Sequence, residues 1–315
     1  MNEERFKVTP ELAGARVDKA VLQLVPGLSR ARVKKAIEAR AVRVNGRVLA
    51  KGALVAAGDE ITITAEHTLP ASAPATPTPD APLVVRFESA TVLVVDKPPG
   101  MPTAPLRGEE VGTLANALVG HYPELAGIGH SPREPGLIHR LDNETSGVLV
   151  VARTAAAFDV LADALKEHVL EKRYLLVCAE DGLADDGSIE FPITNHPKDK
   201  RRVYACIHPR DVMRYEPRPA VTGYRVLKRA GNWALVEASA SKALRHQIRA
   251  HFAAIEHPLA GDELYGGPVI RALGRHALHA SHVAWTGGGG VEAFSVDVPL
   301  PKEMAALLDV GDAGE

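Results

Sequence analysis

Apolar residues in the first 65 positions recur in short segments separated by charged residues, as in a small unit of helices and strands. Val33, Ala36 and Ile37 lie at helical spacing, whereas most of the intervening positions are arginine or lysine. They predict an amphipathic helix over about 30–40, and Ser29 before it can act as its N-cap. We therefore expect a helix with one buried face and one basic face.

A predicted β-hairpin follows this helix. In AVRVNGRVLA two short strands flank Asn45 and Gly46, a dipeptide that suits a turn in which both residues adopt positive φ. Farther on, Ile61 and Ile63 alternate with polar residues in GDEITIT and predict one more strand. Together these elements predict a small α+β N-terminal domain over residues 1–65.

The next segment separates this domain from the rest of the chain. EHTLPASAPATPTPDAP, at 66–82, carries five prolines and shows no apolar periodicity. Proline lacks the amide hydrogen that a helix needs, so the segment predicts an extended spacer between two domains.

Residues 83–302 predict a larger domain in which strands and helices follow one another in irregular order. Because regular βαβ alternation is missing, the order favours an α+β fold around a largely antiparallel mixed sheet. Amphipathic helices are predicted over 156–168 and 244–255, and residues 303–315 are expected to fray as a C-terminal tail. The predicted strands are 92–95, 147–152, 173–180, 221–227 and 233–239.

Composition adds expectations about the environment of the protein. Its 315 residues, of which 46% are apolar, suffice for two folded domains. No apolar run approaches the roughly 18 residues of a membrane-spanning helix, and the first residues lack the apolar stretch of a secretory signal. Cys178 and Cys206 are too few for a disulfide framework. We expect a cytoplasmic protein without a membrane partner.

Charge is distributed unevenly along the chain. Residues 1–65 hold 12 Lys and Arg against 7 Asp and Glu, and residues 196–229 hold 10 against 3, although the net charge is −2. Clustered cations attract phosphates even on a nearly neutral protein, so these segments point to a nucleic-acid partner. A charged, solvated protein surface is the alternative that composition leaves open.

The stretch GLIHRLDNETSGVLVVA is the most informative for chemistry. Asp142 lies in a polar loop that leads directly into an apolar strand, and such a loop can present a carboxylate to a bound ligand. Thr145 and Ser146 offer donors that could fix the loop. That Asp142 instead pairs with Arg140 or caps a turn stays open on these residues alone.

The segment HRLDNETSG, followed by an apolar strand, resembles the signature of the RluA-type family of pseudouridine synthases. The resemblance covers about 82–302 and implies that uridine in structured RNA is isomerised: the bond from the uracil nitrogen to ribose breaks, and the base rejoins through carbon-5. It implies no cofactor and no metal. Further segments that resemble the family, in the expected order, are VLVVDKPPGM, EKRYLLV, RHQIRAHF, HPLAGDELYGG and ALHASHVAW.

A second resemblance concerns the N-terminal domain. GARVDKAV, LSRARVKKAIEARAVRVNG and GDEI resemble the S4-type RNA-binding domain over about 14–64. It implies binding to folded RNA through shape and phosphates. This domain arrangement is common in the family and implies large-subunit ribosomal RNA as the partner, and we expect a monomer.

The family resemblance also implies roles for individual residues. Asp142 corresponds to the catalytic carboxylate, which could attack the uracil, attack the ribose or remove a ribose proton. Arg249 corresponds to its salt-bridge partner, and Tyr174 to a tyrosine that stacks on the flipped base or helps to remove the carbon-5 proton. Other residues expected to contact RNA are His139, Arg140, Leu141, Thr145, Arg245, Gln247 and Ile248, and in the N-terminal domain Arg30, Arg32, Lys34 and Lys35.

One segment departs from the family pattern. Many members carry Gly-Arg ahead of the HQIR sequence, where this chain has Ala243 and Leu244. If 244–255 is one helix, Arg245 and Arg249 share a face at i, i+4 spacing, and Arg245 can supply the missing guanidinium.

Three alternatives remain open. A non-catalytic RNA-binding or ribosome-assembly factor would fit the altered SKALR segment, but the intact Asp142 and Arg249 oppose it. A hydrolase would need a second carboxylate within about 10 Å of Asp142, and Glu144 and Glu263 are candidates. A metal site would use the three histidines of RHALHASH, but no carboxylate or cysteine accompanies them, so we expect no metal.

Overall fold

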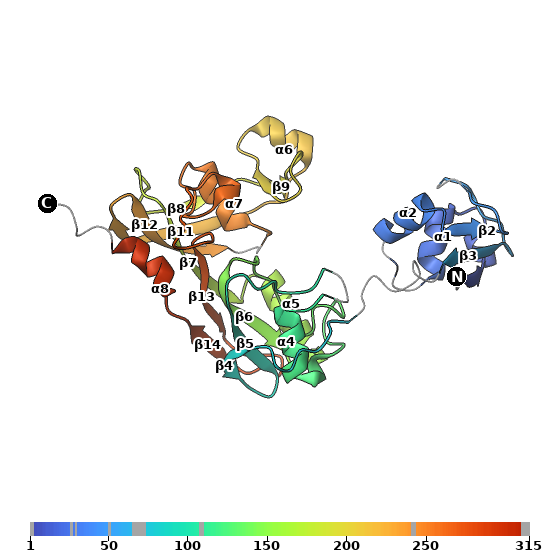
Figure 1. Cartoon of the computed structure of the whole chain (residues 1–315), viewed down its shortest axis with the longest axis horizontal. Helices are drawn as coiled ribbons and strands as arrows, with labels where there is room; N and C mark the ends of the chain where they lie inside the picture. Colours follow the sequence, from blue (N-terminus) through green and yellow to red (C-terminus); the bar gives the residue numbers. More distant parts are fainter. Residues whose placement is uncertain are drawn as a thin grey trace. The chain divides into compact units, whose positions relative to one another are not determined.

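The computed structural model of the chain contains two compact units (Figure 1). The N-terminal unit lies within Met1–Pro74, and the larger unit comprises Ala75–Leu106 and Glu110–Glu315. The residues that the structure describes are 3–25, 28, 30–49, 52–64, 74–106, 110–240 and 244–309, without the side chains of 30–32 and 35.

An antiparallel sheet of order β1-β3-β2 and two helices make up the described part of the N-terminal unit. Val17, Val33, Ile61 and Ile63 are almost wholly buried where the helices pack on the sheet, which confirms the predicted helix and the strand in GDEITIT. The elements are β1 (Glu3–Lys7), a 3-10 turn (Pro10–Leu12), α1 (Val17–Leu24), α2 (Arg30–Glu38), β2 (Val42–Val44) and β3 (Glu60–Thr64).

The predicted hairpin is only half present. Asn45 and Gly46 form the turn, with φ of 49° and 75°, but the second strand is wrong: as far as 47–49 are described, one bridge, between Val44 and Arg47, is all that joins the two sides. Strand β2 pairs with β3 instead. The chain leaves the sheet after the turn because residues 53–55 hydrogen-bond to the segment that leads into α1. The proposed cap, Ser29, lies outside the described residues.

Among the described residues, the larger unit contains a nine-stranded sheet of order β4-β5-β6-β13-β7-β12-β11-β8, with β14 beside β13. Every strand pair in it is antiparallel except β6 and β13, so the expected largely antiparallel α+β fold is confirmed. The strands are β4 (Val84–Glu88), β5 (Val92–Lys97), β6 (Ser146–Ala152), β7 (Glu171–Ala179), β8 (Asp186–Ile189), β11 (Thr222–Ala230), β12 (Trp233–Ala240), β13 (Leu278–Trp285) and β14 (Phe294–Asp297).

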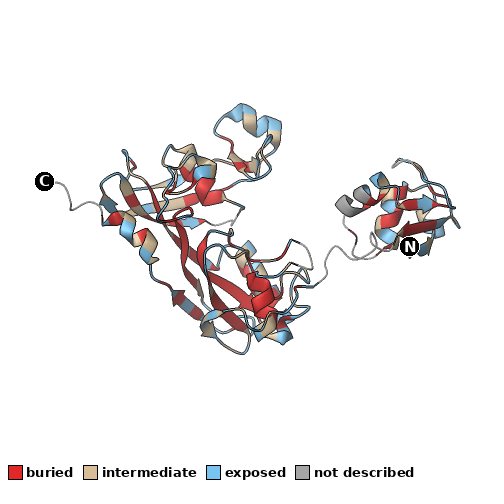
Figure 2. Cartoon of the chain, in the orientation of Figure 1, coloured by how far each residue is buried: buried red, intermediate tan, exposed pale blue. Residues whose placement is uncertain are grey.

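A smaller hairpin and several helices complete this unit. Helix α5 packs on β6, and α7 packs beside β11 and β12, while Figure 2 shows the central strands buried almost throughout. The further elements are β9 (Ile193–Asn195), β10 (Val203–Ala205), α4 (Leu114–His121), α5 (Ala155–Lys166), α6 (Pro209–Tyr215), α7 (Gln247–Ala254), α8 (Lys302–Ala305) and 3-10 turns at Pro123–Leu125, Glu263–Tyr265 and Ala306–Leu308.

The close approach of β6 to β13 explains why position 147 is a glycine. Gly147 has φ of 113°, and a Cβ there would lie 2.1 Å from the carbonyl oxygen of Ala280 on β13. Only glycine fits this position, because the gap leaves no room for any side chain and the backbone conformation disfavours other residues. The start of β6, and with it the polar loop before it, is thereby fixed against β13.

The predicted spacer extends too far toward the C-terminus. Ala75 is buried in the core of the larger unit, and the amide of Thr78 donates to the carbonyl of Asn116 at 3.0 Å. The Asn116 side chain in turn donates to the carbonyl of Thr76 at 2.8 Å. Residues 75–82 therefore belong to the larger unit, because prolines do not prevent an extended chain from pairing with a neighbouring surface.

The predicted tail begins too early. Met304 and Leu308 are buried in a small core beside β12, so residues 303–309 pack as helix and turn rather than fray. Residues 310–315 lie outside the described part of the chain. Within the part that is described, no helix has both the length and the apolar character to cross a membrane.

Candidate active site

A cavity of about 820 Å³ opens where the loop before β6, strand β7 and the start of α7 converge. Asp142, Tyr174 and Arg249, which come from these three elements, all line it. The structure thus brings the three expected catalytic residues together although 107 positions separate Asp142 from Arg249 in sequence.

Hydrogen bonds to backbone groups hold the Asp142 loop on both sides of this residue. The amide of Thr145 donates to the Asp142 carbonyl at 3.1 Å, which closes a turn around the residue. On the other side, Thr103 donates its hydroxyl to the Leu141 carbonyl at 2.7 Å and accepts from the Leu141 amide at 3.2 Å. These bonds fix the direction in which the Asp142 side chain leaves the loop.

Lys97, at the end of β5, supports the same loop from below. Its side chain is fully buried, and its ammonium donates to the carbonyls of Pro98, Met101 and Asn143 at 2.9, 2.7 and 2.9 Å. Burial lowers the pKa of Lys97 to about 8, although Glu144 and Asp142 oppose the shift. One cation therefore ties the DKPPG turn to the residue that follows Asp142.

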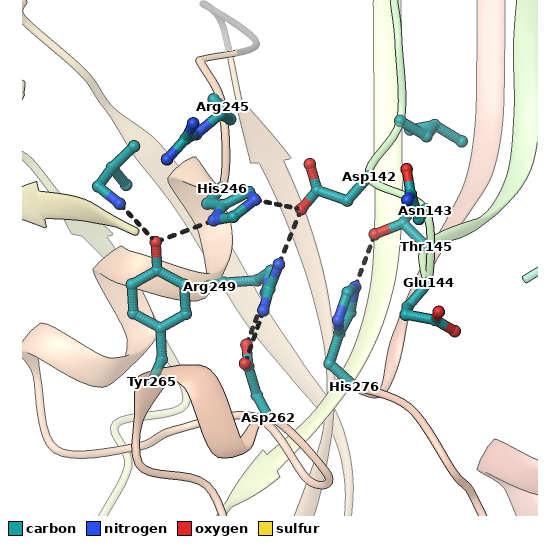
Figure 3. A network of polar contacts seen from close by, with 12 residues as sticks. Asp142, Asn143, Glu144, Thr145, Arg245, His246, Arg249, Asp262, Tyr265 and His276 are labelled. Atoms are coloured by element: carbon teal, nitrogen blue, oxygen red, sulfur yellow. Dashed lines mark hydrogen bonds and ion pairs between the residues drawn. The ribbon is translucent and has the colours of Figure 1, made fainter. Parts of the chain in front are cut away.

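Arg249 is the centre of the polar network (Figure 3). Its Nη1 donates to Asp142 Oδ2 at 3.1 Å, while Nε and Nη2 donate to the two oxygens of Asp262, each at 2.7 Å. The guanidinium also lies over the Tyr265 ring, 5.1 Å from its centroid. Three partners thus hold a planar group that has few rotational alternatives.

Neighbouring carboxylates keep Arg249 charged although its side chain is almost wholly buried. Its side chain is 7% exposed and that of Asp262 is 1% exposed, whereas Asp142 is 22% exposed and open to the cavity. Burial alone would lower the pKa of Arg249, but the hydrogen bonds and charge of Asp262, and then Asp142, raise it. The pair of carboxylates compensates the buried cation, and only Asp142 remains accessible to a ligand.

Tyr174 lies on β7 and is almost wholly buried at the cavity wall. Burial, and then the negative charge of Asp142, raise the pKa of its phenol to about 12. The side chain is therefore a neutral ring at neutral pH. It can offer an apolar face to a bound base.

Two residues of the network were not singled out from the sequence. His246 lies between Asp142 and Tyr265: its Nε2 is 3.7 Å from Asp142 Oδ2, and its Nδ1 is 3.0 Å from the Tyr265 hydroxyl. Asp262 was missed as well. His246 lies in HQIR and Asp262 in HPLAGDELYGG, and the resemblance of these segments to the family was the signal that could have indicated both residues. The local sequence indicates no partner for either residue.

Several residues expected to contact RNA also have structural roles. His139 is buried, and burial lowers its pKa to about 3, so it is neutral and accepts from the Val150 amide at 3.3 Å. The Gln247 amide donates to Val221 and Thr222, and Ile248 is buried in the core. All three residues also line the cavity, so their contact with RNA stays a prediction.

Two further expected residues lie around the cavity. Arg140 is exposed, lines the cavity and pairs with Glu134 at 2.9 Å. Thr145 lines the cavity but is largely buried, and its hydroxyl lies 2.8 Å from the His276 ring, so it also supports the loop. Leu141 is buried at the cavity wall as well, and its carbonyl accepts from Thr103.

The expected shared helix face of Arg245 and Arg249 is wrong. Helix α7 begins at Gln247, because His246 at its N-cap has φ of 53° and turns the chain out of the helical path. Arg245 is exposed and donates to the carbonyls of Lys200 and Arg202 at 3.0 and 2.9 Å. It anchors the segment between β9 and β10, while Ala243 lies outside the described residues.

Basic residues of the N-terminal unit are described only in part. Lys34 is exposed on α2 and lies 3.6 Å from Glu38. The side chains of Arg30, Arg32 and Lys35 lie outside the described residues.

The histidines and carboxylates that suggested other chemistries do not form such sites. His276, His279 and His282 face Thr145, Ser146 and Asp297 separately, and the described residues contain no group of three ligands for a metal. Glu144 points away from the Asp142 carboxylate (Figure 3). Glu144 and Glu134 also line the cavity, and Glu134 is paired with Arg140. Both oxygens of Asp262 are bound to Arg249.

Comparison with known proteins agrees with this geometry. A family described as RNA pseudouridylate synthase matches residues 91–254, and the S4 domain family matches residues 15–61. The fold resembles human RNA pseudouridylate synthase domain containing 4, with a TM-score of 0.55 and 21% identity over 72% of this chain and 92% of that one.

Curated relatives match nearly the whole chain. Ribosomal large subunit pseudouridine synthase D of Neisseria meningitidis is 35% identical over 98% of this chain and 82% of the relative. The protein of that name in Escherichia coli is 32% identical over 96% and 92%, and the uncharacterized RNA pseudouridine synthase YlyB of Bacillus subtilis is 32% identical over 98% of both. The chain belongs to the RNA pseudouridylate synthase family and is an RNA-modifying isomerase that carries an S4 domain ahead of its catalytic domain.

Proposed function

We propose that this enzyme converts specific uridines of large-subunit ribosomal RNA to pseudouridine, with Asp142 as the catalytic carboxylate. Relatives that align with nearly the whole chain carry ribosomal large subunit in their names. The observation that carries the proposal is the carboxylate of Asp142, open to the cavity and oriented by an arginine that Asp262 holds in place.

The reaction rearranges bonds without any net loss of atoms or electrons. The bond between uracil N1 and ribose C1′ breaks, a bond between C5 and C1′ forms, and the hydrogen of C5 is replaced by one on N1. A carboxylate can serve as nucleophile or base in such a sequence. Attack on the uracil, attack on the ribose and removal of a ribose proton are all chemically consistent with Asp142 at this position.

The cavity suits a single flipped nucleotide. Its volume of about 820 Å³ falls within the range of roughly 300–1,000 Å³ that is common for ligand pockets. A base inside an RNA helix has to leave the stack to reach Asp142. Arg140 is exposed at the cavity. We therefore assign its side chain to contact the RNA or to fill the space that the displaced base leaves.

Tyr174 is assigned as the platform for the flipped base. A phenol whose pKa is raised to about 12 by burial retains its proton at neutral pH, which supports stacking over proton abstraction from carbon-5. The family resemblance allowed two roles for Tyr174, stacking on the flipped base and removal of the carbon-5 proton, and this assignment retains only stacking.

The N-terminal S4-type domain, proposed for residues 1–65, would add a second RNA contact through shape and phosphates. The proposed substrate places the reaction in the cytoplasm.

Mapping pseudouridines in ribosomal RNA from cells that lack the protein tests this proposal. We expect one or a few large-subunit positions to lose the modification, and expression of the intact chain to restore them. Unchanged large-subunit RNA together with a lost modification in transfer RNA would refute the substrate. Restoration by Asp142→Asn would refute the assignment of Asp142 as the catalytic residue.

A further inference from the structure

The two oxygens of Asp142 have different surroundings. Oδ2 accepts from Arg249 Nη1 at 3.1 Å and faces His246 Nε2 at 3.7 Å. Figure 3 shows both contacts ending on this one oxygen, while Oδ1 points away from both partners. Within the described part of the chain no hydrogen bond to Oδ1 is seen, so that oxygen is the one free to face a ligand in the cavity.

His246 occupies its place at the expense of backbone strain. It has φ of 53°, a left-handed conformation that a residue with a side chain rarely adopts, and it makes no side-chain cap for α7. Such outliers persist where surrounding structure holds them, and they gather at functional sites. Here the left-handed turn aims the imidazole between Asp142 and Tyr265 rather than toward the free amides of the helix.

Hydrogen bonding determines which nitrogen of His246 carries the proton. The amide of Val203 donates to the Tyr265 hydroxyl oxygen at 2.8 Å, and an amide can only donate. The hydroxyl hydrogen of Tyr265 is then available for His246 Nδ1, 3.0 Å away. If Nδ1 accepts that hydrogen, the neutral ring carries its own hydrogen on Nε2, which faces Asp142.

The electrostatic surroundings favour these protonation states. Burial raises the pKa of Tyr265 to about 12, so its hydroxyl keeps the hydrogen that it donates. Burial also lowers the pKa of His246; Asp142 and Asp262 oppose this shift, while Arg249 and Arg245 reinforce it. The imidazole is therefore neutral at neutral pH and has one acceptor nitrogen and one donor nitrogen.

We propose that His246 is a positioning residue of the reaction: Tyr265 fixes its proton on Nε2, and this N–H, together with Arg249, holds Asp142 Oδ2 so that Oδ1 is presented to the RNA. The inference rests on the proposed role of Asp142. The gap of 3.7 Å is longer than a hydrogen bond, and contacts of this kind tighten when substrate closes the site. Val203 belongs to β10, so the tautomer is set from outside the catalytic loop.

The tautomer can be measured directly on the full-length wild-type chain. Nitrogen NMR of protein labelled with ¹⁵N-histidine distinguishes a ring with hydrogen on Nε2 from one with hydrogen on Nδ1 and from the charged ring. Loss of one signal in His246→Gln assigns it. We expect the neutral Nε2–H form at pH 7, and in Tyr265→Phe a mixture of tautomers. A pure Nδ1–H form or a charged ring in the wild type would overturn the proposal.

Two matched substitutions test the consequence for catalysis. Glutamine places its amide nitrogen near the position of Nε2, so His246→Gln keeps a donor toward Asp142. Asparagine is shorter and reproduces only the position of Nδ1. With an unmodified transcript of large-subunit ribosomal RNA as the probe, we expect single-turnover rates of His246→Asn to fall roughly ten- to a hundred-fold below those of His246→Gln. The dissociation constants for the transcript should stay within about threefold, since neither variant alters a charge that faces phosphate.

Each result has a distinct meaning. Equal rates for His246→Asn and His246→Gln, or a change in RNA affinity without a change in rate, would show that Nε2–H does not position Asp142. Full activity of Asp142→Asn with the same transcript would instead refute the proposed role of Asp142, whatever the tautomer. If His246→Asn fails to fold, as judged by thermal unfolding, the NMR measurement on the wild type, assigned with His246→Gln, still decides the tautomer on which the proposal depends. If His246→Gln fails to fold, the change of one signal in Tyr265→Phe assigns it instead.

Discussion

Arg249 and Asp262 meet through two parallel hydrogen bonds, from Nε to Oδ2 and from Nη2 to Oδ1, each 2.7 Å long. Both side chains are almost wholly buried. A guanidinium held at two points cannot turn, so its remaining nitrogen, Nη1, faces Asp142 in a fixed direction. The orientation of the proposed catalytic carboxylate therefore depends on a residue that is closed off from the cavity.

Asp262→Asn should impair both folding and turnover. The substitution leaves the buried guanidinium with a weaker partner, and we expect the free energy of unfolding to fall by roughly 3 kcal/mol. Single-turnover pseudouridine formation should fall at least about tenfold, with RNA affinity little changed. Asp199→Asn is the matched control, because Asp199 makes the same two-point contact with Arg201 at the surface. A similar effect of both substitutions would argue against the role of burial.

Arg249→Lys should separate charge from geometry. Lysine keeps a positive charge but cannot form the planar two-point contact with Asp262 while it also reaches Asp142. We expect reduced turnover in Arg249→Lys and a larger loss in Arg249→Met. The control is Arg225→Lys, which changes an exposed pair with Glu237. Normal turnover of Arg249→Met between about pH 5 and 8 would contradict the pairing.

Lys97 predicts a specific dependence of stability on pH. Its pKa is about 8 in the folded chain, below the 10.5 that is usual for a lysine in water, so the unfolded chain binds this proton more tightly. Stability should therefore rise as pH increases from about 8 to 10.5, by about 3 kcal/mol for this group. Lys172, whose pKa burial also lowers to about 8, adds a slope of the same sign.

The variant Lys97→Met isolates the first contribution. It should be less stable at neutral pH, because the carbonyls of Pro98, Met101 and Asn143 lose their donor. Its unfolding free energy, measured by denaturant titration at several pH values, should lack the rise between about pH 8 and 10.5 that Lys97 contributes, while the contributions of all other groups remain. An identical slope in both proteins would show that Lys97 keeps its ordinary pKa.

The N-terminal domain should contribute affinity rather than chemistry. Between Gly27 and Lys51 the sequence has eight Lys and Arg and only Glu38 in opposition. If about four of them neutralise phosphates, removal of residues 1–66 should flatten the log–log dependence of RNA binding on salt by about 3 to 4. Turnover at saturating RNA should persist, because a tethered domain raises effective concentration. An unchanged salt slope, or saturated turnover as low as in Asp142→Asn, would contradict this role.

Local patterns predicted the elements of the fold better than their contacts. The apolar run of β6 and the alternation in β3 are visible in the sequence because buried positions in these strands carry apolar side chains. The start of α7 was predicted too early because the sequence does not indicate the left-handed turn at His246, a conformation that is usually signalled by glycine. The spacer was drawn too long because its prolines say nothing about the surface against which residues 75–82 pack.

Contacts within the site were even harder to predict from the sequence than contacts within the fold. Asp142 and Arg249 meet across 107 positions, and only resemblance to a family joined them in advance. Asp262 lies in an ordinary turn after α7, and nothing in the local sequence indicates that its carboxylate is buried against a guanidinium. His139 and Gln247 were expected to bind RNA because they lie in segments that resemble the family, and the sequence did not indicate that their side chains also hydrogen-bond to the backbone.

The most direct test of the account is the activity of Asp142→Asn beside Glu144→Gln on an unmodified large-subunit ribosomal RNA transcript. Both substitutions remove one negative charge from the same loop, but only Asp142 faces Arg249 in the cavity. We predict that Asp142→Asn forms no detectable pseudouridine while it binds RNA within a few-fold of wild type, and that Glu144→Gln remains active. Activity of Asp142→Asn above about a tenth of wild type would contradict the assignment of this carboxylate as the catalytic group.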